Sequence, residues 1–555
     1  MNSSWFRKKD MASLQAEVDE AHSQGVLKKV LKVRDLTFMG IAAVIGAGVF
    51  STIGTAAYNG GPGVIFLFLI TAVTCGFTAL CYAEFASRVP VAGSAYTYSY
   101  VTFGELIAWI IGWALILEYS IGNIVVAISW SAYFNNLLEA VHIHLPSWLA
   151  IGWQTAKANY SEMLASGKDA SQTAYAQAPV VAGFHIVMNL PAFLIVAFVT
   201  LLAYIGISES KKSANLMVGL KLVVLAFIAV VGLWIIFSDD KMGNWSPFLP
   251  NGVTGVLKGV SSVFFAYIGF DAISTTAEEC ANPKRDLPRG MIYSLLICTL
   301  IYVITTLVIT GLVRYSDFKG VADPLAFVFN AINMHKIGFV ISVTAVIAST
   351  SVLLVFQIGQ PRIWMSMSRD GLLPKRFGKI NKKRFTPGFA TIVTGLLVGI
   401  PSLFIDDLLM TDLTSIGTLF AFVLVCGGVL LLPEIEKKTG FRLPYINGRW
   451  IIPALVIIFL LLFRQRLAIA ILHMETENLE ELLFVLFCAI AVVVAILSFV
   501  KHFSLIPILG VLCCLYLMVE IPVNSWIVFF GWMLMGILIY CLYGRKHSLL
   551  NGRGD

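Results

Sequence analysis

The sequence predicts an all-α integral membrane protein of about 14 spans, with a core of two inverted repeats of about five spans each. Three observations predict this fold. Hydrophobic residues make up 58% of the 555 residues and charged residues only 13%, which excludes an ordinary soluble domain. Apolar segments long enough to cross the ~30 Å hydrocarbon layer recur along the whole chain. Two of these segments are interrupted within the membrane.

The apolar segments divide the chain into a tail, two halves and an extension. We expect a polar N-terminal tail over 1–35, five spans in each of 36–237 and 253–433, about four further spans in 450–544, and a C-terminal tail over 545–555. The span centres lie near residues 47, 75, 120, 195, 225, 265, 302, 350, 396, 422, 459, 490, 511 and 534. Arg464 and Arg466 shorten the apolar core of segment 450–473. An odd number of spans per half gives the two halves opposite orientations, which predicts an inverted repeat.

Lys and Arg gather in alternate loops. With the N-terminus inside, about 28 of the 39 Lys and Arg residues fall on the cytoplasmic side, as the positive-inside rule requires. The net charge of +7 is therefore a topology signal and argues against nucleic-acid binding. We expect a multi-pass protein of the cell membrane, surrounded by lipid, with both termini in the cytoplasm. The nine cysteines fall in spans or on the cytoplasmic side, so we expect no external disulfide.

The two interruptions have one physical meaning. Gly46, Ala47 and Gly48 break the first span, and Gly269 with Asp271 breaks the sixth. A broken helix exposes backbone N–H and C=O groups that lipid cannot satisfy, so it survives only where it lines a cavity or meets a ligand. Each break lies in the first span of its half. Two broken helices in one membrane chain therefore indicate a carrier of a small molecule.

Four stretches form long, ordered motifs: Gly46 to Phe50, Phe264 to Pro288, Pro361 to Pro374, and Leu515 to His547. Together they closely resemble the cationic amino acid transporter family of the amino acid–polyamine–organocation superfamily. The resemblance runs from about residue 36 to 548 and implies a leucine-transporter-like core of about ten spans, with two or four more. Residues 450–500 contain no motif of that family.

The breaks suit the two charged ends of an amino acid. The N-terminus of a half-helix offers free N–H groups and a partial positive charge to a carboxylate, and C-terminal carbonyls accept from an ammonium. The candidate substrate-binding residues at the breaks are Ile45, Gly46, Ala47, Gly48, Phe265, Ala266 and Ile268. The resemblance places the substrate at the same positions and makes Phe265 a gate. The alternative is that the small residues merely permit close helix packing.

Lys221 interrupts an otherwise apolar fifth span. An ionised lysine in hydrocarbon is costly, so it faces a cavity or extends to the membrane surface. The resemblance places it against the broken first helix, where sodium-coupled relatives hold a cation, so a proton gained or lost there would couple transport to the proton gradient. The hydroxyls of Ser349, Thr350 and Ser351 are of the kind that ligates sodium. Since an ammonium and Na⁺ would compete for one site, we favour H⁺ as the coupling ion.

Three further residues complete the candidate site. Glu118 lies midway along the third span, where a carboxylate must be neutral or paired. It would bind a cationic side chain or a proton, pair with Lys221, or form a structural hydrogen bond. Phe356 and Gln357 in the eighth span are placed at the side-chain pocket, although ordinary packing is the alternative. Outside this site, Asp271 is expected to cap the half-helix that follows the sixth-span break or to contact neighbouring backbone.

Motifs for enzymatic chemistry are missing from the sequence. It contains no GxxxxGK, HExxH or GxSxG pattern and no paired Cys-x-x-Cys, so we expect no enzyme, no metal and no cofactor. The predicted function is a proton-coupled symporter or exchanger of a cationic or small neutral amino acid. The alternatives are a sodium-coupled or polyamine carrier and an amino acid sensor of the same fold. The oligomeric state is left open, and a monomer is compatible with the sequence.

Overall fold

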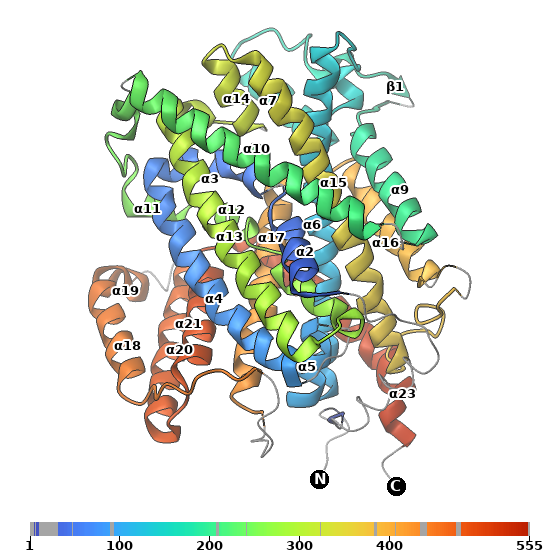
Figure 1. Cartoon of the computed structure of the whole chain (residues 1–555), viewed down its shortest axis with the longest axis vertical. Helices are drawn as coiled ribbons and strands as arrows, with labels where there is room; N and C mark the ends of the chain where they lie inside the picture. Colours follow the sequence, from blue (N-terminus) through green and yellow to red (C-terminus); the bar gives the residue numbers. More distant parts are fainter. Residues whose placement is uncertain are drawn as a thin grey trace.

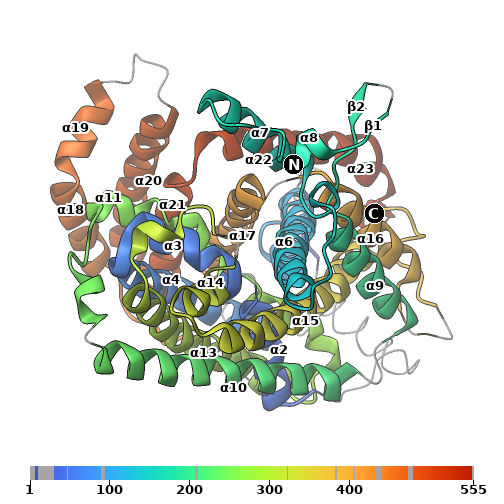
Figure 2. The same cartoon turned by 90° about the horizontal axis from the view of Figure 1, so that it is seen from above.

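The chain folds into a bundle of helices, seen from the side in Figure 1 and from above in Figure 2. A computed structural model describes residues 5, 7–9, 31–46, 48–88, 94–181, 183–206, 210–239, 241–321, 323–381, 384, 386–405, 407–432, 441–472 and 479–552. Of the predicted site residues, Ala47 lies outside the described part.

The helices of the first half follow the order of the predicted apolar segments. They are α2 (Val33–Val44), η1 (Gly48–Thr52), α3 (Ile53–Gly60), η2 (Gly61–Gly63), α4 (Val64–Arg88), α5 (Ser94–Thr102), α6 (Glu105–Ala140), α9 (Leu190–Ile205) and α10 (Ser210–Ser238). Between α6 and α9 lie η3 (Ser147–Leu149), α7 (Trp153–Ala165), α8 (Ala174–Gln177) and a short hairpin. In this hairpin, β1 (Val180–Val181) pairs antiparallel with β2 (Phe184–His185), Val180 opposite His185.

The second half and the C-terminal extension follow. The second half comprises η4 (Lys241–Trp245), α11 (Gly252–Leu257), α12 (Val260–Phe265), η5 (Phe270–Glu279), α13 (Pro283–Leu312), η6 (Tyr315–Phe318), α14 (Pro324–Ala331), α15 (His335–Arg369), α16 (Gly388–Ser402) and α17 (Asp407–Val429). The extension comprises α18 (Ile451–Leu462), α19 (Arg464–Leu472), α20 (Leu479–Lys501), α21 (Leu505–Val519), α22 (Val523–Ile539), η7 (Tyr540–Gly544), α23 (Arg545–His547) and η8 (Leu549–Gly552).

Among the described residues, nine helical stretches are long and apolar enough to cross a membrane, or ten if the bent pair α18–α19 is one span. Every predicted span centre except 47 falls inside a described helix, and α9, α16 and α21 are shorter apolar helices at three of these centres. The count of about 14 spans and the inverted repeat stay predictions. The chain bends by 69° between Leu462 and Arg464, where the two arginines interrupt the apolar pattern.

The helices of the two halves pack around the broken spans. α6 packs against α15 and α17, while α13 packs against α4 and α2. In Figure 2, α10 runs along one side of the bundle and α18 to α20 lie at its edge. α18 to α21 enclose a second apolar cluster of their own, which includes Ile452, Phe484 and Leu512. The C-terminal extension therefore forms its own apolar cluster beside the core, and both broken helices belong to the two halves.

Described residues near the two ends of the chain contact each other. The Trp5 ring lies 6.1 Å from that of Tyr540, and the Arg545 guanidinium lies over the Trp5 ring. Lys9 forms an ion pair with Asp370 at the end of α15, with 2.7 Å between Nζ and Oδ1. The described N-terminal residues therefore pack against the end of α15 and against the C-terminal segment.

Candidate functional site

The two breaks lie directly against each other in the core. A Cβ atom added to Gly48 would come within 2.4 Å of the Ala266 Cα, and one added to Gly269 within 2.9 Å of the Ala43 Cβ. The earlier residue of the first break faces the later residue of the second, and the reverse, so the two segments run antiparallel. An inverted repeat requires this direction. Sequence reasoning expected the breaks to face each other, and the structure brings them together.

The first break opens between two kinds of helix. The α2 helix ends at Val44, and Ile45 turns the backbone to an extended conformation. Beyond Ala47 the chain resumes as the π-helix η1, whose first amides turn back on the break: Val49 N and Phe50 N donate to the Gly46 carbonyl at 3.2 and 3.1 Å. The Gly46 carbonyl accepts both of these amides, so the start of η1 closes on the break itself.

The second break is a tight turn of backbone. After α12 ends at Phe265, Tyr267 N donates to the Phe264 carbonyl and Ile268 N to the Phe265 carbonyl. Gly269 has a φ of +111°, a left-handed conformation that side chains disfavour, and the 3₁₀-helix η5 starts after it. Asp271 lies in the first turn of η5, but neither of its carboxylate oxygens has a hydrogen-bond partner among the described residues, so the expected side-chain cap is absent there.

Lys221 is buried against the first break. Its Nζ donates to the carbonyls of Ala42 at 3.1 Å and Ile45 at 2.7 Å, and to the Ser351 hydroxyl at 3.3 Å. The side chain has 0% exposure, so it does not extend to the membrane surface. The lysine thus ties the end of α2 to α15. Its hydrogen-bond partners among the described residues are two carbonyls and a hydroxyl, and Glu118 is not one of them.

The small residues of the first break are also packing residues. A Cβ atom on Gly46 would lie 2.4 Å from the Val352 Cγ2, and the contact at Gly48 is with Ala266 backbone. Close packing is therefore sufficient to require both glycines, and ligand approach is a second, compatible reason. Ile45, Phe265, Ala266 and Ile268 are all buried as well. The region between the breaks is closed to solvent in this structure.

Glu118 belongs to a buried polar cluster away from Lys221. Its side chain is 2% exposed and lies beside Thr418 of α17, and its charge interacts with that of Asp271. Its Oε2 has no hydrogen-bond partner among the described residues. Tyr82 and Tyr119 are part of the same cluster. A buried carboxyl in such surroundings must share a proton or meet a cation.

Phe356 and Gln357 lie on the side of α15 that faces α6. The Phe356 ring contacts Tyr119 edge-on, with ring centroids 5.3 Å apart. Gln357 accepts from the Asn123 amide at 3.1 Å and donates to the Thr200 hydroxyl at 2.9 Å. The Gln357 amide therefore joins α6, α15 and α9, which is a structural role. Its assignment to the side-chain pocket stays a prediction.

Two tyrosines that sequence reasoning missed also hold the breaks. The Tyr133 hydroxyl of α6 donates to the Phe50 carbonyl in η1. The Tyr302 hydroxyl of α13 lies 2.7 Å from the Val44 carbonyl oxygen and 2.6 Å from the Ala266 carbonyl oxygen. A tyrosine in an apolar helix gives no sign of what its hydroxyl reaches. Only the packed structure identifies these contacts.

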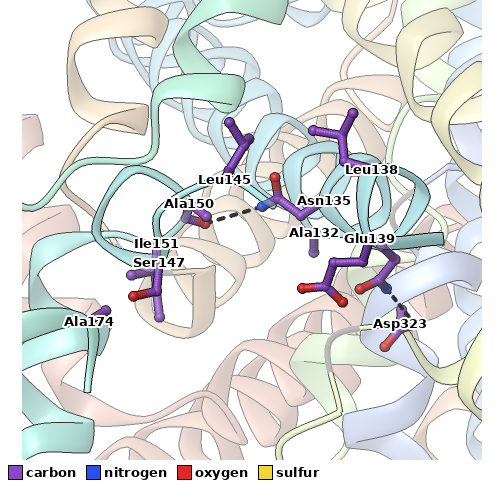
Figure 3. A pocket seen from close by; sticks show the side chains of 11 residues that line it. Ala132, Asn135, Leu138, Glu139, Leu145, Ser147, Ala150, Ile151, Ala174 and Asp323 are labelled. Atoms are coloured by element: carbon purple, nitrogen blue, oxygen red, sulfur yellow. Dashed lines mark hydrogen bonds between the residues drawn. The ribbon is translucent and has the colours of Figure 1, made fainter. Parts of the chain in front are cut away.

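An open cavity of about 330 Å³ lies at the far end of α6 from the termini (Figure 3). It is lined by Ala132, Asn135, Asn136, Leu138, Glu139, Leu145, Ser147, Ala150, Ile151, Ala174 and Asp323. Asn136 donates to Asp323 at 2.7 Å, drawn as a dashed line in Figure 3. Burial, together with the nearby Glu139, raises the pKa of Asp323 to about 6. The predicted site residues at the breaks do not line this cavity.

Comparison with known families decides the class of the protein. The family model described as amino acid permease matches residues 31–496, and the model for the C-terminus of these permeases matches residues 504–548. The chain belongs to the amino acid permease family. This confirms the resemblance to the amino acid–polyamine–organocation superfamily, whose members are carriers and not enzymes.

Individual relatives cover almost the whole permease. It is 38% identical to the branched-chain amino acid permease BcaP of Bacillus subtilis, over 99% of this chain and 100% of that one. It is 34% identical to the methylthioribose transporter of the same organism, again over 99% and 100%. A vacuolar cationic amino acid transporter of Arabidopsis thaliana is 32% identical over 95% of this chain and 93% of its own length. The names of these three relatives refer to three different substrates: branched-chain amino acids, methylthioribose and cationic amino acids.

Proposed function

We propose that this permease is a proton-coupled amino acid transporter that works by alternating access. The observation that carries the proposal is the position of Lys221 at the end of the first half-helix. An ammonium there occupies the place of a coupling cation, and its gain or loss of a proton changes the charge of the site without a second ion. Ser351 is engaged by Lys221 and Thr350 by Trp130, which leaves fewer hydroxyls for sodium.

We propose a neutral amino acid with an apolar side chain as the substrate. The aromatic pair of Phe356 and Tyr119 beside Gly122 supports an apolar pocket, and the name of the branched-chain relative agrees. A cationic substrate is the second candidate. It is favoured by the free Oε2 of Glu118 among the described residues, because that buried oxygen would accept from a cationic side chain.

The orientation is part of the same proposal. Both termini lie in the cytoplasm of a protein of the cell membrane, because the basic loops gather on the side that the positive-inside rule assigns to the cytoplasm. The contacts of Trp5 with Tyr540 and Arg545 support a common side for the two ends.

Uptake into sealed liposomes tests the function. Radiolabelled leucine and arginine are offered separately, with an inward proton gradient and no sodium. We expect leucine to accumulate above equilibrium and a protonophore to abolish the accumulation; arginine as the better substrate would select the cationic candidate. Uptake that needs sodium would move the coupling to the region of Ser349. Binding without uptake under any ion would favour the sensor. Net uptake into empty liposomes separates symport from exchange, which needs amino acid inside.

The variant Lys221→Ala tests the coupling residue. We expect proton-driven accumulation to fall by about tenfold or more, while substrate binding persists, because the site loses its titratable charge. Lys258→Ala is the matched control, since Lys258 is exposed at the end of α11. Full accumulation by Lys221→Ala would remove this lysine from the mechanism.

A further inference from the structure

Tyr302 joins the two breaks from a third helix. It lies in α13, is 0% exposed, and its hydroxyl oxygen is 2.7 Å from the Val44 carbonyl and 2.6 Å from the Ala266 carbonyl. Val44 is the last residue of α2, and Ala266 directly follows α12. One hydroxyl therefore reaches the C-terminal carbonyl ends of both half-helices.

The hydroxyl cannot satisfy both carbonyls. A tyrosine carries one O–H donor, whereas the two carbonyl oxygens each need one, and a buried carbonyl without a donor is costly. The last carbonyls of a helix also bear its partial negative charge. The pair of carbonyls around Tyr302 is therefore one donor short, at a place where a positive group would be favoured.

The Tyr302 hydroxyl is held rigidly in place. Its ring packs against Phe68, 5.5 Å between centroids, and edge-on against Tyr267 at 5.3 Å. The Tyr267 hydroxyl in turn donates to the Phe68 carbonyl. An aromatic ring fixed in this way has little rotational freedom, so the hydroxyl sets the separation of the two carbonyls that it contacts.

Tyr302 and the proposed coupling residue Lys221 contact the carbonyls of consecutive residues. Lys221 holds the Ile45 carbonyl, and Tyr302 holds the carbonyl of the preceding residue, Val44. The electrostatic interaction of Lys221 with Cys298, one turn before Tyr302 on α13, shows that this helix faces both contacts. Lys221 and Tyr302 therefore hold the carbonyls of two consecutive residues at the end of α2.

We propose that Tyr302 is a positioning residue, which fixes the Val44 and Ala266 carbonyls at the spacing that receives the α-ammonium of the amino acid. In the loaded state the hydroxyl donates to one carbonyl and the ammonium to the other, so the missing donor comes from the substrate. This inference rests on the proposed function, because it requires an amino acid at the breaks. It adds a residue outside both breaks that determines affinity.

Tyr302→Phe removes the hydroxyl and keeps the ring. Because the carbonyls lose their alignment in the free and bound protein, we expect the KM for leucine uptake to rise about tenfold while the maximal rate changes less than about twofold. Thr306→Val is the matched control: it lies one turn further along α13, is equally buried, and its hydroxyl donates to the Tyr302 carbonyl of the same helix. We expect its KM to stay within about twofold of the parent value.

The outcomes separate the two proposals. A parent protein that transports amino acid, together with Tyr302→Phe at an unchanged KM or with a loss only in maximal rate, would overturn the role of Tyr302 alone. A parent protein that neither binds nor transports any amino acid would overturn both. If Tyr302→Phe does not fold, the test is made on the parent protein by measuring its affinity for N-methyl-leucine. The secondary ammonium of this compound has fewer N–H donors and an added methyl group. We expect it to bind at least about tenfold more weakly than leucine, and equal affinity would overturn the inference.

Discussion

The first and second breaks lie against each other, yet they are stabilised by different means. At the first, a side chain from another helix holds the open carbonyls, as Lys221 donates to both Ala42 and Ile45. At the second, the backbone closes on itself through successive tight turns after Phe264, and Gly269 supplies the left-handed residue. Tyr302 contacts one carbonyl of each.

The difference assigns separate roles to the two breaks. A break held by a titratable ammonium changes its energy when a proton arrives or leaves, because hydrogen bonds to a charged group are worth about 1.5–3 kcal/mol. The turns of the second break are closed by hydrogen bonds between backbone groups, so they depend on conformation, although the Asp271 carboxyl lies in the turn that follows. On the proposed mechanism, the first break responds to the coupling proton, and the second preserves a fixed shape opposite it.

The largest effect is expected from Gly269→Ala, which attacks the second break through its conformation. Alanine disfavours a φ of +111°, and its Cβ would lie 2.9 Å from that of Ala43 and 3.2 Å from the Ala43 carbonyl carbon. Backbone strain and overpacking together predict a loss of about 3 kcal/mol of stability. Thermal unfolding of the purified protein in detergent measures this loss.

The control for this variant is Gly219→Ala in α10. A Cβ atom there has no neighbour within 4 Å, and alanine favours a helix interior over glycine by up to about 1 kcal/mol. We therefore expect Gly219→Ala to melt at or above the parent temperature. If the two variants melted together, the second break would not depend on the left-handed backbone at Gly269.

How far the sequence predicts these breaks depends on the kind of contact. The glycines at 46, 48 and 269 are visible as interruptions of apolar spans, and the lone charge of Lys221 requires a buried partner, so both could be expected from residue types. The interruption of the apolar pattern at Arg464 and Arg466 is likewise visible in the sequence, whereas the 69° bend at that place is seen only in the structure.

Contacts between distant helices are not visible in the same way. Tyr302 reaches Val44, 258 positions away, and Gln357 meets Asn123 and Thr200 on two other helices. Nothing in the local pattern of α13 or α15 says which neighbour a polar tip will reach, because that depends on how the helices pack. The contacts of Tyr302 with both breaks could therefore not be predicted from the sequence.

A smaller effect is expected from Ser351→Ala, which removes one hydrogen-bond acceptor of the Lys221 ammonium at the first break. Lys221 would lose one acceptor and keep two carbonyls, so we expect a cost of about 1.5 kcal/mol, or roughly a tenfold loss of proton-driven uptake. Ser349→Ala is the control, because its hydroxyl has no hydrogen-bond partner among the described residues. The reverse ranking, with Ser349→Ala the more damaging in sodium, would identify a sodium site instead.

The smallest effect is expected at Asp323, which is linked to η1 through α6. Asn136 and Tyr133 lie one turn apart on α6; Asn136 donates to Asp323 and Tyr133 to the Phe50 carbonyl of η1. Burial raises the pKa of Asp323 from 3.8 to about 6. The folded protein therefore binds a proton more readily than the unfolded chain, so this group's contribution to stability grows as the pH falls through 6 towards 4.

We expect the free energy of unfolding to rise by about 1 kcal/mol between pH 7 and pH 5 from this group. In Asp323→Asn that increment should vanish, because an amide does not titrate. Thermal unfolding of both proteins across the pH range measures the difference, which cancels the contributions of other titrating groups. An identical pH dependence would mean that Asp323 is already solvated. The link from Asp323 through α6 to η1 would then contribute nothing to the pH dependence of stability.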